Sequence, residues 1–501
     1  MMEVWQQDWA AKWAVYSPEK VAIREHERDR ILTYGQMNRL GNRLVHYLRS
    51  EHSLQKGDRV AVLAEFSVEY IVAFSAAQKA GFILVPLNYR LAPAEIEYLL
   101  QDSSPALIIA EAKFTHILPE VSVPVTSTEE LEELLNPDVQ LPEDTSVALA
   151  QVQEDDPVFI LYTSGTTGFP KGALYTHKML FWNSINTAIS LVVNTESRTI
   201  NVMPPFHTGG WNVLITPFLH HGAYVCLLKK FDPATALELL QSERCTIFMG
   251  VPTILQMIAR DPAFEKASFP DMIYLIVGGE PMPIPLIEQW HGKKVPVRQG
   301  YGMTEVGPNL TSLHQNDAIR KKGSIGRPNF YVQTKIVDEN GNDQPPGGAP
   351  GELWLRGPMV MPGYWNNPKA STAAFSDDGQ WFRTGDELYQ DEEGYLFVVD
   401  RIKNMYKSGG ENVYPAEIER VLIQFPGVAE VAVTGVPDDK WGEVGKAFVV
   451  MQEDFSFDSQ ALSDYCREKL ARFKVPKYFQ PMESLPKTDS GKINRNQLKK
   501  S

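Results

Sequence analysis

Short runs of apolar, often β-branched residues recur along the first part of the chain and alternate with longer, helix-like segments. Residues 60–63 (VAVL) and 82–85 (FILV) flank one such segment. Further runs of this kind lie at residues 106–110, 158–162, 200–203, 224–228, 246–249 and 273–277. Strands that alternate with helices form βαβ units, so the pattern predicts an α/β fold with largely parallel sheets covered on both faces.

The pattern changes in the middle of the chain, where alternating apolar and polar residues replace the continuous apolar runs. Residues 332–337 and 352–356 alternate in this way on either side of the dipeptide Asn340-Gly341. A further turn, Glu-Glu-Gly at residues 392–394, precedes another apolar run. Alternation of period two around such turns predicts antiparallel hairpins, so we expect a smaller β-rich subdomain at about residues 310–400.

A polar link at residues 401–404 precedes a new α/β pattern, which runs from residue 405 into a polar, lysine-rich tail. We therefore expect a large N-terminal body of residues 1–400, built from stacked parallel and mixed sheets with the β-rich subdomain. A small C-terminal α+β unit of residues 405–501 follows the link.

The composition is that of a globular protein and limits the class of partner. Of 501 residues, 43% are hydrophobic and 22% are charged, and 62 acidic against 48 basic residues give a net charge of −14. An acidic surface repels phosphate backbones, so nucleic acid is not expected as a partner. A charged substrate must be held by a local site.

The cysteines and the N-terminus are typical of a cytoplasmic protein. Cys226, Cys245 and Cys466 lie far apart and form neither a zinc motif nor a disulfide framework. Residues 1–13 lack the continuous apolar core of a signal peptide. No segment has the ~18 unbroken apolar residues of a transmembrane helix. We expect a soluble, cytoplasmic protein without a transmembrane segment.

A loop rich in glycine and hydroxyl residues follows the run at residues 158–162. Glycines let backbone N–H groups converge on an anion, hydroxyls add donors and a lysine supplies charge. The loop is not a Walker A motif, because Phe169 and Pro170 separate Gly168 from Lys171. It predicts phosphate binding, and the alternative is a glycine-rich turn without a ligand. The residues concerned are Thr163, Ser164, Gly165, Thr166, Thr167, Gly168 and Lys171.

Two more segments with glycines, residues 278–281 (GGEP) and 299–305 (QGYGMTE), each follow a predicted strand. Open α/β sheets bind ligands at the carboxyl ends of their strands. Tyr301 offers a flat face for a base, Thr304 a phosphate donor and Glu305 an oxygen ligand for Mg²⁺. A tyrosine between glycines is more often a packed core residue, so these segments predict a site only when taken together.

Residues 161–172 (LYTSGTTGFPKG) resemble the phosphate loop of the acyl-adenylate-forming enzymes. This superfamily contains acyl- and aryl-CoA synthetases, amino-acid adenylation domains of peptide synthetases, and beetle luciferases. Its other motifs follow in order as PPFHTGG at 204–210, GGEP at 278–281, GYGMTE at 300–305, FRTGD at 382–386, DRIK at 400–403, SGGEN at 408–412 and PKTDSGK at 486–492. The resemblance covers essentially the whole chain, and motifs in this number and order are specific.

The resemblance implies how ATP and Mg²⁺ are held. Asp386 would accept both ribose hydroxyls, with Arg401 beside it, although Asp386 alone could equally be a turn residue. Glu305 would hold Mg²⁺, which prefers few protein carboxylates plus phosphate oxygens. Besides the loop, the implied nucleotide residues are Gly279, Glu280, Pro281, Gly300, Tyr301, Gly302, Thr304, Asp386, Val398, Arg401 and Lys492.

Lys492 is implied as the lysine of the first reaction, in which the acid attacks the α-phosphate of ATP and pyrophosphate leaves. An ammonium that bridges both partners positions them and offsets the developing charge. The alternative is that Lys492 is one of several lysines in the polar tail. The catalytic residues implied are Lys492, Thr304, Glu305 and His207.

The resemblance also implies that the C-terminal unit is a mobile lid, which turns about Lys403 between two half-reactions. Glycines on its second face would let the thin pantetheine chain of CoA pass the backbone. The residues implied for CoA are Ser408, Gly409, Gly410, Trp441, Phe473, Lys474 and Lys477. The two lysines could instead be solvated charges.

His207 is implied at the mouth of the acid pocket, whereas a buried core histidine is the alternative. Amino-acid adenylation domains carry an aspartate at the matching place, and a buried unpaired ammonium would be costly, so amino acids are not expected. The implied lining contains no Arg or Lys and fits a fatty or aromatic monocarboxylate, with Trp211 shortening the tunnel. This lining is His207, Trp211, Val277, Gly278, Gly300, Met303 and Val306.

We predict an AMP-forming acyl- or aryl-CoA synthetase, a ligase that uses ATP, Mg²⁺ and CoA on a small-molecule carboxylic acid. Two alternatives stay open. The enzyme could pass its acyl group to a carrier protein or another acceptor, or the chain could bind nucleotide without turnover. The sequence is compatible with a homodimer.

Overall fold

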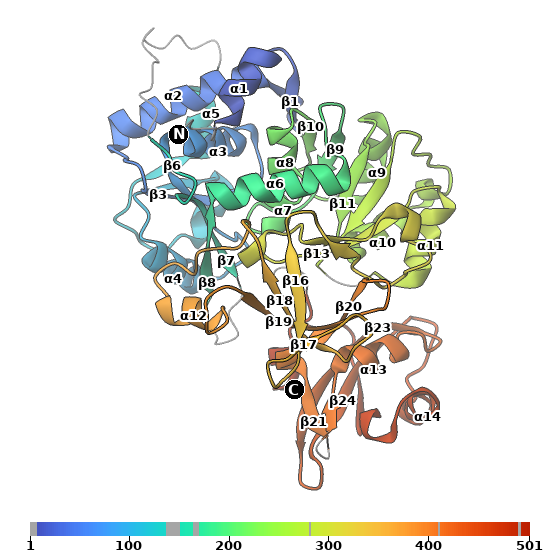
Figure 1. The fold of residues 1–501 in the computed structure, drawn as a ribbon. Helices are drawn as coiled ribbons and strands as arrows, with labels where there is room; N and C mark the ends of the chain where they lie inside the picture. Colours follow the sequence, from blue (N-terminus) through green and yellow to red (C-terminus); the bar gives the residue numbers. More distant parts are fainter. Residues whose placement is uncertain are drawn as a thin grey trace. The chain divides into compact units, whose positions relative to one another are not determined.

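Each apolar run predicted as a strand lies in a sheet of the computed structural model (Figure 1), which confirms the α/β fold class with mixed sheets. The structure describes residues 8–136, 151–163, 170–279, 282–408, 411–488 and 492–500. Contacts within the chain divide it into two units. The first comprises Met1–Gln333 and Arg356–Phe382, and the second comprises Thr334–Leu355 and Arg383–Ser501.

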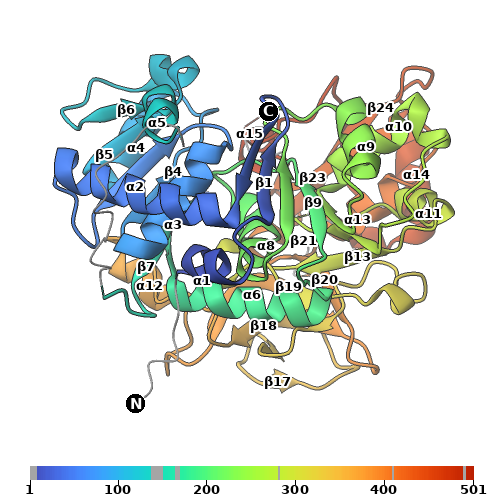
Figure 2. The ribbon, with the colours of Figure 1, turned by 90° about the horizontal axis from the view of Figure 1, so that it is seen from above.

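The largest sheet of the first unit has six strands in the order β6-β5-β3-β4-β7-β8. Its strands pair in parallel except β7 and β8, which are antiparallel. Helices α2 and α3 lie side by side (Figures 1 and 2). The strands are β3 (Arg59–Leu63), β4 (Ile83–Pro86), β5 (Leu107–Ala110), β6 (Val125–Ser127), β7 (Pro157–Thr163) and β8 (Lys171–Thr176). The helices of this part are α1 (Trp9–Tyr16), α2 (Tyr34–His52), α3 (Val68–Ala80), α4 (Pro93–Ser103), α5 (Thr128–Leu134) and the 3-10 helix η1 (Ala112–Ile117).

Two further sheets complete the first unit, with orders β2-β1-β10-β9 and β11-β12-β13-β14-β15. Strands β11, β12 and β13 are parallel, so their carboxyl ends lie at one edge. The strands are β1 (Val21–Glu25), β2 (Arg30–Thr33), β9 (Arg198–Asn201), β10 (Tyr224–Leu227), β11 (Ile247–Gly250), β12 (Tyr274–Val277), β13 (Val297–Tyr301), β14 (Thr311–Ser312) and β15 (Arg327–Pro328). The helices are α6 (His177–Leu191), α7 (Thr208–Asn212), α8 (Ile215–His220), α9 (Pro233–Ser242), α10 (Pro252–Arg260), α11 (Ile284–Gly292), α12 (Pro368–Ala373), η2 (Pro262–Glu265), η3 (Thr304–Val306) and η4 (Gln315–Asp317).

The second unit contains residues 334–355 and 383–400 of the predicted β-rich region together with the C-terminal part of the chain, whereas residues 310–333 and 356–382 of that region belong to the first unit. Its sheets have the orders β17-β16-β18-β19-β20 and β22-β21-β24-β23, and β25 pairs with β24. The strands are β16 (Gln333–Val337), β17 (Asp343–Gln344), β18 (Gly351–Arg356), β19 (Phe382–Gln390), β20 (Leu396–Arg401), β21 (Tyr406–Ser408), β22 (Glu411–Val413), β23 (Val428–Asp438), β24 (Gly442–Met451) and β25 (Tyr478–Pro481). The helices are α13 (Pro415–Leu422), α14 (Ser459–Lys469), α15 (Arg495–Leu498), η5 (Ile402–Asn404) and η6 (Arg472–Lys474). The β-rich sheet is thus grouped with the C-terminal segment, and a lid limited to residues 405–501 stays a prediction.

A buried ion pair fastens the first three helices to one another. The Lys79 ammonium of α3 lies 2.7 Å from a carboxylate oxygen of Asp8 and 2.6 Å from the amide oxygen of Asn38 in α2. Asp8 also caps α1, because its side chain accepts a hydrogen bond from the Ala11 N–H. Burial lowers the pKa of Lys79, and the Asp8 charge opposes this effect.

Helix α6 buries several polar residues beside its apolar ones. The side chains of Asn183, Ser184, Asn186 and Thr187 are buried, whereas Ile189 is 48% exposed. Buried polar groups need hydrogen-bond partners. The Asn183 amide donates to the backbone of α7, and the Thr187 hydroxyl accepts from the segment that follows β13. The buried polar residues of α6 therefore hold two neighbouring segments.

We expect Asp8→Ala to destabilise the first unit by about 3–5 kcal/mol, because the Lys79 ammonium would stay buried without its counter-charge. Urea unfolding followed by tryptophan fluorescence measures the shift of the first transition. In the double variant Asp8→Ala/Lys79→Met the buried charge is absent, so most of the loss should be recovered. A midpoint of Asp8→Ala equal to that of the wild type would contradict the role of this pair.

Candidate active site

The phosphate loop predicted from the sequence is closed at its base by the β7–β8 pair, in which Thr163 lies opposite Lys171. Two hydrogen bonds hold the start of β8 and the residue before it. The Tyr98 hydroxyl donates to the Pro170 carbonyl at 3.3 Å, and the Trp365 N–H donates to the Gly172 carbonyl at 2.7 Å. The loop residues Ser164, Gly165, Thr166, Thr167 and Gly168 lie outside the described residues.

Glu305 lies beside this stem, although it is distant in sequence. Its side chain is buried, and its Oε1 atom accepts hydrogen bonds from the Thr163 hydroxyl at 3.4 Å and from the Tyr364 hydroxyl at 3.0 Å. The Met361 N–H donates to the Glu305 carbonyl at 2.8 Å, which fixes the backbone. The structure thus brings together the residue implied for Mg²⁺ and the base of the phosphate loop.

The arrangement around Glu305 fits Mg²⁺ better than a metal that needs several protein ligands. Among the described residues, no group of three or more His, Cys, Asp or Glu side chains could hold a metal ion. Mg²⁺ is commonly bound through one or two carboxylates plus phosphate oxygens and waters, so a single buried glutamate beside a phosphate loop suits it.

Tyr364 is a site residue that the sequence did not reveal. Its ring faces the Lys171 ammonium, with 5.2 Å between the nitrogen and the ring centroid. Burial and the charge of Glu305 raise the pKa of Tyr364 far above its usual value, so the phenol stays protonated and donates its hydrogen. Neither its spacing nor its neighbours in the sequence indicate these contacts, because both join segments that are remote in sequence.

The glycines after β12 and β13 lie at one sheet edge, as predicted for the adenine region. Val277 pairs with Gln299, so Gly278 and Gly300 follow at neighbouring strand ends. A Cβ at Gly278 would come no closer than 3.9 Å to its nearest neighbour, the Gly300 carbonyl oxygen. Gly279 has a φ of +85°, which favours glycine. Glu280 and Pro281 lie outside the described residues.

Tyr301, Gly302, Met303 and Thr304 continue from this edge and are all partly exposed. The Leu310 N–H donates to the Tyr301 carbonyl at 3.0 Å, which folds the chain back on itself. A Cβ at Gly302 would lie 2.1 Å from the Pro308 carbonyl oxygen. Only glycine, which has no Cβ, lets the two backbone segments come this close.

On the side implied for the acid, His207 precedes helix α7 and Trp211 lies within it. Trp211 has 0% exposure, and Val277 and Val306 are also buried. The Trp211 ring contacts four aromatic rings at centroid distances of 4.8–5.3 Å, namely Phe66, Tyr70, Phe74 and Phe159. Trp211 therefore fills space inside an aromatic cluster.

Two methionines that the sequence did not single out face Gly209, next to His207. A Cβ at Gly209 would lie 3.7 Å from the Met203 methyl carbon and 3.9 Å from the Met249 methyl carbon. Met203 is partly exposed and Met249 is buried. Flexible thioether side chains adapt to ligand shape, so this lining is apolar and compliant.

Asp386 and Arg401, which the resemblance implies lie beside each other, form an ion pair. They are register partners on the antiparallel strands β19 and β20, and the guanidinium lies 3.1 Å from the carboxylate. Asp386 is buried, and its backbone N–H donates to the Thr384 hydroxyl at 3.1 Å. Val398 is half-buried on β20.

The residues implied for the hinge lie in the second unit. Lys403 is exposed within η5. The preceding Asp400 is buried, and its carboxylate accepts from the Asn404 amide at 3.0 Å and from the Ala416 N–H at 2.8 Å. Asp400 thus braces the polar link against the start of α13.

The residues implied for CoA lie on several elements of the same unit. Trp441 and Phe473 expose large parts of their rings, at 48% and 39%. Lys474 pairs with Glu417 at 2.7 Å, and Lys477 pairs with Asp438. Ser408 ends β21, while Gly409 and Gly410 lie outside the described residues. Lys492 is exposed, and its carbonyl accepts from the Thr488 N–H at 2.6 Å.

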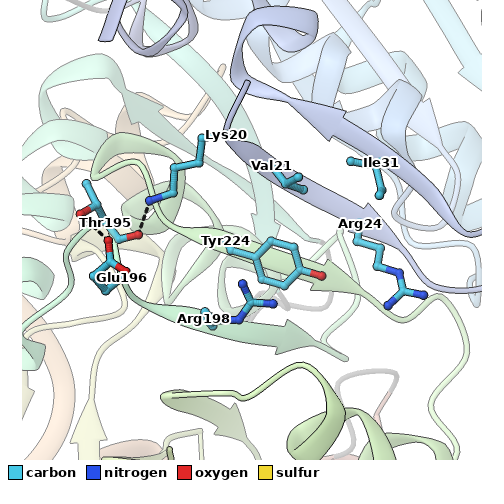
Figure 3. Close-up of a pocket in the computed structure, with 8 residues that line it drawn as sticks. All are labelled: Lys20, Val21, Arg24, Ile31, Thr195, Glu196, Arg198 and Tyr224. Atoms are coloured by element: carbon cyan, nitrogen blue, oxygen red, sulfur yellow. Dashed lines mark hydrogen bonds between the residues drawn. The ribbon is translucent and has the colours of Figure 1, made fainter. Parts of the chain in front are cut away.

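A pocket of about 380 Å³ lies in the first unit, lined by none of the predicted site residues (Figure 3). It contains three basic side chains, Lys20, Arg24 and Arg198. Both guanidinium groups pair with the buried Glu243, and the Lys20 ammonium donates to the Thr195 carbonyl. Arg24 also pairs with Asp29 at 2.7 Å, and Glu196 lines the pocket. Three carboxylates thus balance the three basic side chains, and the pocket lacks the excess positive charge that would indicate an anion site.

Comparison with known proteins gives a consistent result over the whole chain. The family model for AMP-binding enzymes matches residues 10–365, and the model for their C-terminal domain matches residues 417–492. Feruloyl-CoA synthase from an Amycolatopsis species is 37% identical over 492 residues, 98% of each chain. Long-chain-fatty-acid–CoA ligase FadD13 from Mycobacterium tuberculosis is 37% identical over 491 residues, 97% of this chain and 96% of the relative.

Solved structures of similar proteins include complexes with an acyl-adenylate and with ATP. o-Succinylbenzoate CoA synthetase (MenE) from Bacillus subtilis, in complex with the intermediate OSB-AMP, matches with a TM-score of 0.89 and 32% identity. The match covers 99% of this chain and 98% of that one. ATP-bound MatB from Rhodopseudomonas palustris matches with a TM-score of 0.90 and 31% identity over 99% of each chain. Among the described helices of the present chain, none is both long and apolar enough to cross a membrane.

We expect Gly302→Ala to cost about 1–3 kcal/mol of stability and to weaken ATP binding, because the added methyl group must displace the Pro308 backbone. Thermal unfolding and calorimetric titration with ATP measure the two effects. Gly278→Ala is the matched control at the same sheet edge, where the methyl group would make only an ordinary van der Waals contact at 3.9 Å, and its thermal midpoint should equal that of the wild type. Equal behaviour of both variants would contradict the backbone contact at Gly302.

Proposed function

This chain belongs to the family of AMP-binding enzymes, and from this premise we propose that it joins a carboxylic acid to the thiol of CoA through an acyl-adenylate. The observation that carries the proposal is the hydrogen bond between the base of the phosphate loop, at Thr163, and the buried Glu305 carboxylate. The similarity to feruloyl-CoA synthase, FadD13 and indoleacetate–CoA ligase supports an acid–thiol ligase.

In the first reaction, an oxygen of the acid attacks the α-phosphorus of ATP and the bond to the β-phosphate oxygen breaks, which releases pyrophosphate. Residues 163–168 and Lys171 would hold the departing phosphates through backbone N–H groups, hydroxyls and one ammonium. Glu305 would bind Mg²⁺, which neutralises phosphate charge. Thr304 would donate to a phosphate oxygen. The Lys492 ammonium would bridge the acid and the α-phosphate.

The remaining nucleotide contacts would orient the α-phosphate for in-line attack. The Tyr301 ring would lie against the adenine, beside residues 278–281 and the backbone of Gly300 and Gly302. Asp386 would accept both ribose hydroxyls, and the Arg401 guanidinium at 3.1 Å holds its carboxylate in place. Val398 would contact the sugar from β20.

In the second reaction, the CoA thiol loses its proton, its sulfur attacks the acyl carbonyl, and AMP leaves as the thioester forms. We propose that residues 405–501 turn about Lys403 between the reactions, and that Ser408, Gly409 and Gly410 then line the path of the pantetheine chain. The exposed rings of Trp441 and Phe473 are available to the CoA nucleotide. Lys474 and Lys477 would exchange their carboxylate partners for its phosphates.

The acid is proposed to be a fatty or aromatic monocarboxylate. His207 and Gly209 would stand at the mouth of the pocket, and Met203 and Met249 add apolar surface to the predicted lining. Because Trp211 is held inside an aromatic cluster, the lining favours aromatic and shorter acids over long chains.

A panel of acids tests this function. The protein is incubated with ATP, Mg²⁺ and aromatic, short, medium or long monocarboxylic acids, with and without CoA. We expect pyrophosphate release with at least one aromatic or medium-length acid, and a thioester with AMP only when CoA is added. Pyrophosphate release without a thioester would favour another acyl acceptor. If ATP binds but no acid leads to pyrophosphate release, the chain binds nucleotide without turnover.

Lys492→Ala should slow acyl-adenylate formation by about 100-fold or more, because one preorganised charge at the reacting phosphate is lost. Thioester formation from supplied acyl-adenylate should be largely spared. Lys487→Ala removes another lysine of the same tail, which pairs with Glu430 at 2.9 Å, and should behave as the wild type. Equal loss of both reactions in Lys492→Ala would refute its assignment to the first one.

A further inference from the structure

Two contacts hold the backbone of Tyr364, so the position from which its side chain extends is fixed. It forms an isolated β-bridge with Ala173, two residues beyond Lys171. Its N–H donates to the Ser371 hydroxyl of α12 at 2.8 Å. The residue is therefore tied to the strand that leaves the phosphate loop and to a helix behind it.

The Tyr364 hydroxyl orients the buried Glu305 carboxylate. Its hydrogen bond of 3.0 Å ends on Oε1, and the longer bond from the Thr163 hydroxyl ends on the same atom. Among the described residues, these are the side-chain donors to Glu305, so Oε2 keeps its lone pairs for another partner. A carboxylate held through one oxygen presents the other in a fixed direction.

The ring of Tyr364 acts on a second site residue. The Lys171 ammonium lies 5.2 Å from the ring centroid, within the range of a cation–π interaction. One side chain thus touches both the lysine proposed for the phosphates and the carboxylate proposed for the cation.

We infer that Tyr364 is a positioning residue for the nucleotide's divalent cation, through the hydrogen bond that fixes Glu305. The inference rests on the proposed assignment of Glu305 to Mg²⁺. Groups that hold a metal ligand in orientation typically contribute 10- to 100-fold in metal affinity. A tyrosine that only fills space would act through its ring, whereas this role depends on its hydroxyl and on the cation.

Calorimetric titration of ATP into the protein, once with Mg²⁺ and once with EDTA, separates these effects without turnover. In the wild type we expect Mg²⁺ to tighten ATP binding. Tyr364→Phe keeps the ring and loses the hydroxyl, so the tightening by Mg²⁺ should fall by about 10-fold or more while the affinity in EDTA stays unchanged. Tyr364→Leu also removes the ring from Lys171, so its affinity should fall in both conditions.

Two further variants calibrate the measurement. Tyr175→Phe removes the hydroxyl of a buried tyrosine of β8, and should bind ATP as the wild type does in both conditions. Glu305→Gln should lose the effect of Mg²⁺, and adding Tyr364→Phe to it should cause no further loss, because both act on one interaction.

The outcomes distinguish this inference from the proposed function. If Mg²⁺ tightens ATP binding in the wild type and equally in Tyr364→Phe, the inference is wrong and the function stands. Additive losses in the double variant would also overturn it. If Glu305→Gln responds to Mg²⁺ as the wild type does, the assignment of Glu305 fails and the inference falls with it.

Discussion

The hydrogen bonds to one oxygen of Glu305 connect three segments of the first unit that carry residues of the proposed site. A buried carboxylate is costly unless donors or a cation compensate its lost hydration. Here Thr163 comes from the phosphate-loop hairpin, Tyr364 from the segment before α12, and Glu305 itself from the turn after β13. Both donors, at 3.4 and 3.0 Å, end on the same oxygen, Oε1. The other oxygen, Oε2, is therefore available to the cation that we propose for this site.

The buried polar residues of α6 explain how the turn carrying Glu305 is held. Asn309, near the end of that turn, donates to the Thr187 hydroxyl of α6 at 2.5 Å and to the Val213 carbonyl at 3.1 Å. Asn183 of the same helix donates to the Asn212 carbonyl in α7, next to Trp211. An apolar inner face could pack against these segments but could not fix their backbones. Directional hydrogen bonds in a dry interior set positions that packing alone would leave free.

Much of the fold followed from the sequence because its parallel strands are buried on both faces. Strands such as β5 and β12 are continuous apolar runs, and such runs can be recognised in the sequence without knowledge of their partners. The Asn340-Gly341 turn could also be recognised from contiguous residues alone, and Gly341 has a φ of +84°. The grouping of the β-rich sheet with the C-terminal segment was not predicted, since it depends on contacts between distant segments.

The site could be predicted to the extent that its residues occur in contiguous motifs. Glu305, Asp386 and Lys171 were singled out in this way, their roles stay predictions, and the Asp386–Arg401 pair agrees with their implied association. Tyr364, Met203 and Met249 were not singled out, because the contacts that make them candidates come from neighbours remote in sequence. The buried polar residues of α6 were also missed, since an apolar stripe normally marks the buried side of a helix.

If the acid lies where we propose, the packing of Trp211 sets an energetic limit on its length. Its ring is surrounded by Phe66, Tyr70, Phe74 and Phe159, so a longer acyl chain that entered this space would have to displace it. Loss of a packed tryptophan costs about 3–5 kcal/mol. Each methylene that an acid buries returns about 0.8 kcal/mol. A chain would therefore need roughly four to six additional buried methylenes to balance the displacement, whereas an aromatic acid that ends before Trp211 has nothing to displace.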